Sequence, residues 1–505
     1  MYLLVGAALL HLQSPEQRNS AYKYVPGLTG ASMTAPWQEH PDIAMSLLKD
    51  PLHGGRRSGD SANSSDLDNL LSDDASEASS MDLPPVDGGR RAWTCLLGCW
   101  LVEAMIWGFP LAFGVFQRHY SANELFRESG MIPTIGTLAT GMSYIGMPFS
   151  NPVAMRWPQH RKKMCVAGWL MCLAGLVGAS FARHAWQLLL SQGFLYGFGW
   201  AVCYTPFLFM LNEWFVEKRG LAYGILFGAS GVSGFVIPVA VGWMLERFTF
   251  RAALRVYVLA TIMISGPGLF LIRPRTPPQR GLAVREKQGP GILQALQPFA
   301  KDLHFYLFAA AVFVQGLGFF IPNVFIPSYA EGMGLSSSAG TGLLALVSLS
   351  QVFGQPWQGW VSDKVNIHVL AAVSALVPGL GALLLWGPAK GMVHLVPFAL
   401  IWGFFSASYS VLYTRMITFL TRTHANGDLG DSTGMLIYGF FSFERGVSNI
   451  LEGPISTWLI GGDGGTLDVG KYGLGRYASV IWFTVVCMLA SSFVGVGWFW
   501  SPKLR

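Results

Sequence analysis

Three charged side chains lie deep inside apolar stretches of the sequence: Glu103 within 93–116, and Glu444 and Arg445 within 433–459. A charge in such surroundings is costly, and it usually marks a functional site with a partner nearby. Because burial favours the neutral form of a carboxyl group, Glu103 is a candidate to bind and release a proton. The alternative is a neutral, hydrogen-bonded acid that packs against its neighbours. Arg445 either holds an organic anion or braces a contact between helices.

Other kinds of chemistry have no sequence support. We find no Ser/His/Asp or Cys/His arrangement and no metal-ligand spacing, so we expect neither an enzyme nor a cofactor or metal. The Gly-x4-Gly-Lys-Ser/Thr loop that binds ATP phosphates is also missing. The six cysteines lie in apolar stretches without a Cys-x-x-Cys pair, which is typical of small buried fillers. The formal charge of +6 comes from basic residues beside apolar stretches, so no nucleic-acid partner is expected.

Composition indicates an all-α integral membrane protein whose first partner is the lipid bilayer. The 505 residues are 52% hydrophobic and only 12% charged, and their mean hydropathy is +0.41. Each apolar stretch must be a helix, because the bilayer core offers no water to the backbone. The sequence predicts twelve spans, near 93–116, 131–153, 164–182, 186–211, 221–245, 252–272, 304–329, 338–361, 367–387, 393–417, 433–459 and 478–500.

The longest break between spans divides them into six and six. It runs from Arg273 to Asp302 and contains five prolines. Before the first span, Ser58 to Asp82 is rich in Ser, Asp and Glu, a composition that cannot bury enough apolar surface to fold. We therefore expect a disordered cytoplasmic tail, an N-terminal six-helix bundle, a cytoplasmic central loop and a C-terminal six-helix bundle, at 1–86, 87–272, 273–303 and 304–505.

Basic residues concentrate in alternate loops, including 161–163, 218–219 and 273–301. Because positively charged loops stay in the cytosol, this bias predicts that both termini are cytoplasmic. The hairpin from Gly193 to Leu245 carries glycines at four-residue spacing, which lets membrane helices approach closely.

Several stretches also resemble one known family. Asp87-Gly88-Gly89 precedes the first span, and Arg161-Lys162-Lys163 fills the loop after the second. The other matching stretches are Trp214-Phe215 with Lys218-Arg219, Pro327-Ser328-Tyr329-Ala330, Gly354 and Gly359 with Asp363-Lys364, and Arg445-Gly446 with Gly453-Pro454-Ile455. With the six-plus-six plan, this ordered set resembles the monocarboxylate porter family of the major facilitator superfamily, in particular its fungal branch.

The resemblance implies that spans 1, 4, 7 and 10 line a central cavity. The candidates there for contact with a solute or proton are Glu103, Tyr196, Trp200, Tyr204, Gln315, Asn323 and Tyr409, joined by Arg445. Such an aromatic set suits a flat, partly apolar organic solute better than a hydrated ion. About half of these aromatics are expected only to pack against neighbours.

This chain departs from the lactate carriers of that family at three charged positions. Leu111 stands where those carriers have a lysine in span 1, and Gln351 and Gln355 stand where they have an Asp and an Arg in span 8. A glutamine forms hydrogen bonds but cannot titrate. Simple proton-linked lactate transport is therefore not favoured, although both glutamines stay candidates for binding the solute.

Charged residues at the inner helix ends are candidates for a gate. An acidic group stabilises a helix N-terminus and a basic group a C-terminus, so such contacts can latch two halves together. The alternative is topology and anchoring alone. The gating candidates are Arg161, Lys162, Lys163, Lys218, Arg219, Asp363 and Lys364.

The resemblance implies a secondary transporter of a small organic solute, with protons as a candidate coupling ion. Efflux of a secondary metabolite or organic acid is the first expectation. Proton-linked uptake of a monocarboxylate or vitamin-like nutrient is the second, and a sensor that does not transport is the third. We expect the plasma membrane, with a vacuolar or other organelle membrane as the alternative.

Overall fold

A computed structural model describes residues 84–126, 129, 131–275, 297–424, 431–462, 468 and 471–500, and they contain helices and no strand. These helices all belong to one compact unit. The predicted disordered tail falls outside the described residues except for 84–86, and so does 276–296 of the predicted central loop.

The first group of helices covers residues 89–271. Its members are α5 (Gly89–Ala122), α6 (Ile132–Ile145), α7 (Met147–Arg156), α8 (Arg161–Ala179), α9 (Ala185–Leu188), the π-helical η2 (Leu189–Leu195), α10 (Tyr196–Trp214), α11 (Arg219–Arg247) and α12 (Phe250–Leu271), with a short 3₁₀ turn η1 (Pro158–His160) before α8.

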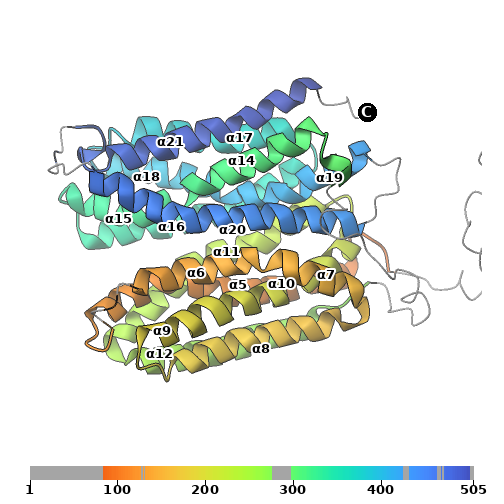
Figure 1. Ribbon diagram of the computed structural model, residues 1–505, viewed down its shortest axis with the longest axis horizontal. Coiled ribbons are helices and arrows are strands. Elements are labelled where there is room, and N and C mark those ends of the chain that lie inside the picture. The colour runs from red at the N-terminus through yellow and green to blue at the C-terminus, as the bar shows by residue number, and fades with distance from the viewer. Residues whose placement is uncertain are drawn as a thin grey trace, which may run out of the picture. The chain divides into compact units, whose positions relative to one another are not determined.

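The second group begins after the short turn η4 (Gln297–Phe299). Its members are α14 (Leu303–Phe319), α15 (Ile321–Gly332), α16 (Ser337–Ser362), α17 (Ile367–Gly381), η5 (Ala382–Trp386), α18 (Met392–Ile401), η6 (Trp402–Ser406), η7 (Ala407–Leu412), α19 (Tyr413–His424), α20 (Asp431–Gly462), η8 (Tyr472–Leu474), α21 (Ala478–Ser492) and η9 (Phe493–Trp500). In Figure 1 this group, coloured green to blue, lies above the first.

Nine of the described helical segments are long and apolar enough to cross a membrane. Three further ones, α6 with α7, α16 and α20, complete the predicted twelve. Buried polar residues lower the hydropathy of α16 and α20, for example Gln355 and Arg445. Large apolar side chains cover the outside, among them Met263, Val393 and Trp458 at 74%, 84% and 75% exposure. Such a surface suits lipid, and the protein is a multi-pass membrane protein.

Two spans are broken where the sequence predicts continuous helices. Span 2 divides at Gly146 and span 7 at Phe320, and a proline follows each break, at Pro148 and Pro322. Proline has no N–H to donate and its ring crowds the preceding turn, so it begins a new helical segment more easily than it continues one. These prolines are the sequence signal for both breaks.

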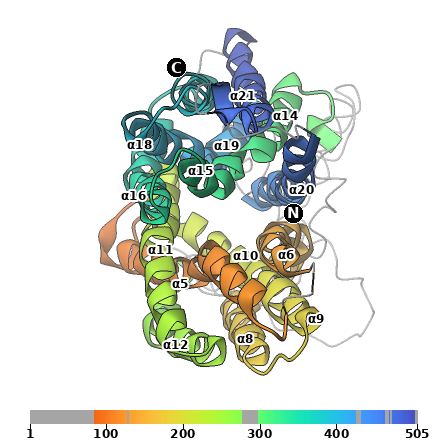
Figure 2. The same cartoon turned by 90° about the vertical axis from the view of Figure 1, so that its left-hand side faces the viewer.

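The two groups meet along two seams, which Figure 2 shows nearly end-on. Helix α11 packs against α16 in the most extensive contact between the groups, and α20 packs against α6 and α7. We call the end of the bundle where α5 begins the Asp87 end. The second seam is tied near that end, where the Asn151 side chain donates to the carbonyl oxygen of Met435 at 2.7 Å.

Glycines bring the backbones of α11 and α16 into direct contact. A Cβ atom at Gly224 would stand 2.4 Å from the carbonyl oxygen of Gln355, and one at Gly359 would stand 2.2 Å from that of Gly220. No Cβ is tolerated at such distances unless the helices separate. The prediction that these glycines tighten the 193–245 hairpin is therefore wrong about the partners. Gly224 in α11 packs against α16, whereas Gly197 in α10 packs against α6, where a Cβ would stand 2.5 Å from the carbonyl oxygen of Ala139.

We expect Gly224→Ala to loosen this seam and to lower stability by about 1–3 kcal/mol, because the added methyl group overpacks a backbone contact. The matched control is Gly228→Ala in the same helix, whose Cβ would lie 3.6 Å from the nearest atom of Pro356. The midpoint of thermal unfolding in detergent measures both. Equal midpoints for the two variants would contradict the close approach.

Candidate functional site

Glu103 lies halfway along α5 in an aromatic environment. Its side chain is 1% exposed, and its carboxyl group interacts with the indole of Trp107 one turn later. The second carboxyl oxygen, Oε2, has no hydrogen-bond partner among the described residues. The Trp107 ring lies 5.6 Å from that of Tyr144 and 6.4 Å from that of Trp200. A buried acid with one unpaired oxygen is equipped to take up a proton or a ligand donor.

The aromatic rings continue from Glu103 towards the second group of helices. Trp200 and Tyr204 have ring centroids 4.8 Å apart, and the Tyr204 hydroxyl lies 3.3 Å from that of Tyr438 in α20. The indole N–H of Trp200 is buried and finds no acceptor in the described part of the chain. We call Trp107, Tyr144, Trp200, Tyr204 and Tyr438 the aromatic cluster. It includes residues of both groups.

Arg445 lies on the other side of this region, in α20. Its side chain is 4% exposed, and the guanidinium donates to Oε1 of Gln315 and stacks 4.3 Å from the Phe319 ring centroid. Gln315 in turn donates to the backbone and side-chain oxygens of Ser406, at 3.2 and 3.3 Å. Arg445 therefore braces spans 7, 10 and 11, which is one of its two predicted roles. A guanidinium has five N–H donors, so this geometry leaves capacity for an anion as well.

A second buried acid on α20, Glu452, was not singled out from the sequence. It is 4% exposed and accepts a hydrogen bond from the backbone N–H of Phe320, at 3.2 Å. Its position seven residues after Arg445 places both on one face of the helix. The break of span 7 at Phe320 frees that N–H from helical pairing, and Glu452 satisfies it. In the sequence, the seven-residue spacing from Arg445 could have identified Glu452. It was not singled out because it stands near the end of the predicted span.

Span 10 passes through a π-helical segment, η6, into a 3₁₀ segment, η7. Such transitions leave carbonyl groups without their usual helical donor. Three glutamine side chains donate to carbonyl oxygens of this stretch. Gln315 donates to Ser406, as described above. Gln358 donates to Phe404 at 3.1 Å, and Gln355 donates to Ala407 at 3.4 Å. Gln355, a candidate for binding solute, thus uses its amide N–H on the backbone, while its buried Oε1 is without a partner within the described residues.

The remaining candidates occupy different settings. Tyr196 donates to the carbonyl oxygen of Ile106 at 2.5 Å, inside the first group. Tyr409 accepts from Ser491 at 3.4 Å, inside the second. Gln351 donates to Ser230 at 2.9 Å across the α11–α16 seam, and Asn323 is half-buried in the first turn of α15. Tyr196 and Tyr409 thus brace their own groups, whereas Gln351 joins the two.

Among the gating candidates, Asp363 joins the two groups directly. It follows the last residue of α16, and its two carboxyl oxygens accept from the backbone N–H groups of Gly220 and Leu221, both at 3.0 Å. These belong to the unpaired first turn of α11, so a carboxylate from one group caps a helix of the other. Burial raises the pKa of Asp363 above its usual value, and the two N–H donors only partly oppose that rise.

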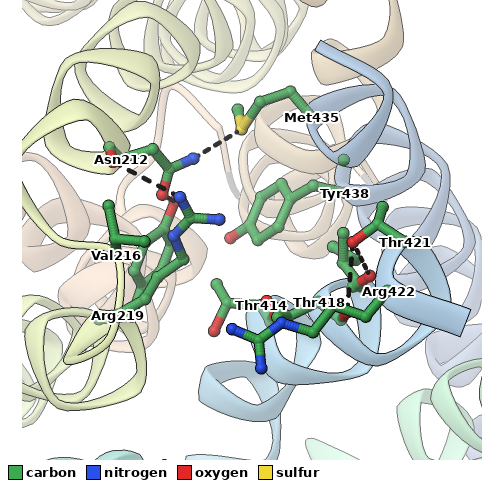
Figure 3. Close-up of a pocket in the computed structure, with 12 residues that line it drawn as sticks. Asn212, Val216, Arg219, Thr414, Thr418, Thr421, Arg422, Met435 and Tyr438 are labelled. Atoms are coloured by element: carbon green, nitrogen blue, oxygen red, sulfur yellow. Dashed lines mark hydrogen bonds between the residues drawn. The ribbon is translucent and has the colours of Figure 1, made fainter. Parts of the chain in front are cut away.

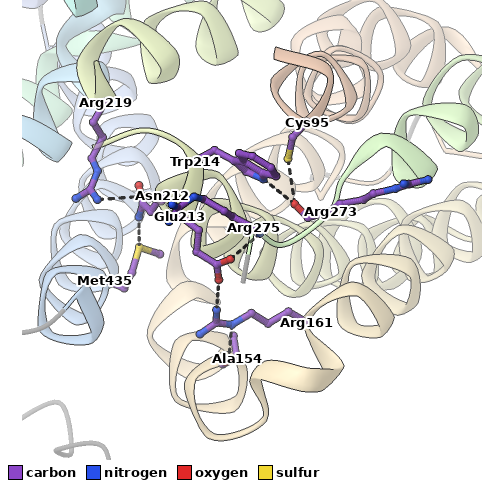
Figure 4. A network of polar contacts seen from close by, with 10 residues as sticks. All are labelled: Cys95, Ala154, Arg161, Asn212, Glu213, Trp214, Arg219, Arg273, Arg275 and Met435. Carbon is purple, nitrogen blue, oxygen red and sulfur yellow. Dashed lines mark hydrogen bonds and ion pairs between the residues drawn. The ribbon is translucent and has the colours of Figure 1, made fainter. Parts of the chain in front are cut away.

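Arg161 is held within the first group, as Figure 4 shows. It forms an ion pair with Glu213 at 2.9 Å, and the other Glu213 oxygen accepts from the backbone N–H of Arg275, also at 2.9 Å. Lys162 and Lys163 follow in the first turn of α8. The Lys364 ammonium lies 3.6 Å from the Trp360 ring centroid, inside the second group.

Lys218 belongs to a small backbone cradle. Its N–H group and those of Val216 and Glu217 donate to the carboxylate of Asp87, at 2.9–3.1 Å. Burial opposes ionisation of Asp87, but the three donors outweigh it, so that its pKa lies below the usual value. This cradle fixes the turn that leads into α11 and so positions the helix end that Asp363 caps.

A cavity of ≈ 180 Å³ lies between the two groups at the Asp87 end. Arg219, the last gating candidate, lines it from α11, and Arg422 lines it from α19. Figure 3 shows the Tyr438 ring projecting from α20 towards Arg219. Because Tyr438 also touches Tyr204, the cavity ends where the aromatic cluster begins.

Twelve crossing helices in two groups, with buried charges and aromatic rings between them, define a membrane transporter. The chain belongs to the Major Facilitator Superfamily, whose family model matches residues 95–451.

Relatives agree with this assignment. The chain is 27% identical to the MFS transporter asaE of Aspergillus flavus, over 76% of this chain and 83% of that protein. It is 28% identical to the fujikurins efflux protein of Gibberella fujikuroi, over 72% and 76%. It is also 26% identical to monocarboxylate transporter 12 of Xenopus laevis, over 76% and 85%. The resemblance to monocarboxylate porters and their fungal branch is thereby confirmed.

A solved structure of the fucose:proton symporter FucP of E. coli matches 81% of this chain and 98% of its own, with a TM-score of 0.58 and 16% identity. This likeness concerns the fold. The predicted arrangement of two six-helix bundles is confirmed.

We expect Asp363→Asn to weaken closure at the Asp87 end by about 0.5–2 kcal/mol, because the amide accepts only one of the two hydrogen bonds and loses the negative charge that favours a helix N-terminus. Labelling of a Thr414→Cys reporter in the cavity by an impermeant maleimide measures this, since the six native cysteines are buried. The reporter should react faster in the Asp363→Asn background. An unchanged labelling rate would exclude the cap as a latch.

Proposed function

We propose that this protein is a secondary transporter that exports an organic anion with a flat, apolar body. The observation that carries the proposal is that Glu103 and Arg445 are both buried, each beside an aromatic ring of its own group of helices, Trp107 and Phe319. Tyr144 connects their surroundings: its ring centroid lies 5.6 Å from that of Trp107, and its side chain packs against Gly446, the residue after Arg445. A solute lying on such rings gains apolar and stacking contacts, and the guanidinium selects for negative charge.

The names of the relatives support export. The fujikurins efflux protein is one, and the aspyridones efflux protein apdF of Emericella nidulans is another. Uptake of a monocarboxylate is the second candidate, supported by the match to monocarboxylate transporter 12. Against that candidate, Gln351 and Gln355 are engaged in contacts between and within the groups. They therefore do not replace the charged pair of the lactate carriers.

We propose that the Asp87 end faces the cytosol and that both termini lie there, in the plasma membrane. The basic residues at this end include Arg90, Arg91, Arg156, Arg161, Lys162, Lys163, Lys218, Arg219, Arg273, Arg275, Lys301, Lys364 and Arg422. Those at the opposite end are fewer, and include Arg118, Arg183, Arg247, Arg251, Lys390, Lys471 and Arg476. Positive charge is retained on the cytosolic side, which supports this orientation.

Alternating access follows from the two seams. The bundles proposed at 87–272 and 304–505, joined in sequence by 273–303, rock against each other about the site between them. Closure at the Asp87 end relies on the Asp363 cap, the Gly224 contact and the Asn151 hydrogen bond. Opening at that end requires all three to break, so solute has access to the aromatic cluster from one side at a time.

The native host offers a test that works even while the solute is unidentified. Deleting the gene should raise the ratio of intracellular to extracellular amount for at least one aromatic acid, and the wild-type gene should restore it. A fall of that ratio on deletion would indicate uptake instead. No change in any metabolite would contradict transport in that host.

We expect Arg445→Gln to fail in this complementation or to need at least tenfold more solute for half-maximal transport, because the anion loses a charge-assisted hydrogen bond. Arg445→Lys is the matched variant, since it keeps the charge and loses the fork of donors. Proteoliposome transport of the accumulated acid separates affinity from maximal rate. Undiminished affinity in Arg445→Gln would assign the residue to the brace alone.

We expect Glu103→Gln to abolish the dependence of transport on a pH gradient while leaving exchange of solute intact, because glutamine cannot release a proton. Glu452→Gln is the comparison, since Glu452 is engaged at the break of span 7. Uphill transport and equal-pH exchange are measured on the same vesicles. A pH response that survives in Glu103→Gln would remove it as the proton carrier.

A further inference from the structure

We propose that Asn449 in α20 binds a carboxamide or lactam group of the solute, beside the carboxylate that Arg445 binds. This inference rests on the proposed function and adds a second requirement to the solute, a hydrogen-bond donor and acceptor side by side. The side chain of Asn449 is 6% exposed, and neither its Oδ1 nor its Nδ2 has a hydrogen-bond partner among the described residues.

The polar side chains next to Asn449 on α20 are engaged. Ser448 donates to the carbonyl oxygen of Arg445 at 2.9 Å, and Glu452 accepts from the backbone N–H of Phe320. An asparagine in a membrane helix ordinarily forms hydrogen bonds to a neighbouring helix, because a buried amide without a partner is unfavourable. Asn449 keeps a donor and an acceptor that the described part of the chain does not take up, so both serve a ligand.

Asn449 lies on a face of α20 that separates two packed sides. On one side Gly446 packs against α6, where a Cβ atom would stand 3.0 Å from the Cβ of Tyr144. On the other side Ser448 packs against Gly316 of α14. Successive residues of a helix are about 100° apart, so Asn449 falls between these sides. It therefore lies between a helix of the first group and a helix of the second, next to a member of the aromatic cluster.

The spacing from Arg445 sets the size of the solute. Asn449 follows Arg445 by one helical turn, and residues four apart lie on one face with their Cβ atoms about 5–6 Å apart. Ser442, one turn before Arg445, is buried, and its hydroxyl also has no partner within the described residues. A six-membered ring that carries a carboxylate and an amide on opposite sides has a comparable length. Such a ring also suits the aromatic cluster.

The amide of Asn449 selects the chemical class of the second group. A primary amide pairs edge to edge with a carboxamide or a lactam, because each partner donates one N–H and accepts with one carbonyl oxygen. A ketone or ester offers an acceptor alone and leaves Oδ1 unpaired. A buried site that forms hydrogen bonds to its ligand rejects an analogue without the matching group, since its own polar atoms then stay unpaired. Acids that carry an amide are therefore preferred.

The test is equilibrium binding to the full-length protein in phosphatidylcholine nanodiscs, with three flat acids as probes: para-carbamoylbenzoate, para-acetylbenzoate and benzoate. The acetyl group replaces the amide NH₂ by a methyl group of similar size, and benzoate has neither group. We expect the amide-bearing acid to bind roughly tenfold more tightly than the other two. Asn449→Leu should reduce its affinity to that of benzoate. Equal affinities of the amide and acetyl acids for the unmodified chain would overturn the inference.

Folding is measured on the same proteins. Leucine replaces an amide without a partner by an apolar side chain of similar size, so Asn449→Leu should not lower the midpoint of thermal unfolding. A lowered midpoint would assign the amide to the fold, through a buried water, and would also overturn the inference. Thr457→Val is the matched control, since the exposed Thr457 on the same helix donates to the carbonyl oxygen of Gly453 at 2.9 Å. It should keep the full preference.

The roles of Arg445 and Asn449 are separable. Arg445→Gln should weaken binding of all three acids, because each presents a carboxylate to the guanidinium. Three acids that bind equally, and all through Arg445, would leave the proposed anion site standing and remove the role of Asn449. An amide preference that depends on Asn449, with binding unaffected by Arg445→Gln, would contradict the anion site instead. Binding of none of the three acids would contradict both.

Discussion

A single carboxylate, Asp363, reaches from one group of helices to cap a helix of the other. It binds the first turn of α11, whose backbone N–H groups have no partner within their own helix. The glycines of the seam allow α16 to approach closely enough for the cap to form. The Asp87 cradle fixes the turn before α11. The closed Asp87 end thus depends on an interaction that can break without leaving a charge in the bilayer, because Asp363 lies beyond the end of α16.

Deeper in the protein the constraint is different, because polar groups there must be satisfied without water. The irregular turns of span 10 and the break of span 7 both free backbone groups, and glutamines and Glu452 occupy them. Arg445 is held by Gln315 in the same network. Glu103 and Trp200 at the aromatic cluster, and Gln355 beside span 10, each keep one polar atom without a partner in the described part of the chain. These atoms are available to hydrogen-bond a solute at the site that we propose.

Most of the fold could be predicted from the sequence, because apolar stretches of membrane length have one stable solution. The twelve spans and their six-plus-six division followed from that rule. The breaks in spans 2 and 7 were not predicted, although Pro148 and Pro322 signalled them, since prolines also occur within continuous membrane helices such as α11 at Pro238. The site was predicted less completely. Charge within apolar stretches singled out Glu103 and Arg445, which the structure buries, and their role at the site stays a prediction. The use of Gln355 on span 10 depends on helix geometry that periodicity does not reveal.

The most direct measurement is the distance between spin labels on Lys163→Cys and Lys364→Cys, one at the Asp87 end of each group of helices. The native cysteines are buried, so labelling is selective. In nanodiscs we expect two populations, a shorter distance for the capped state and a longer one whose share rises when Asp363 is replaced by Asn. One distance, unchanged by that replacement, would contradict the claim that this carboxylate holds the two halves together.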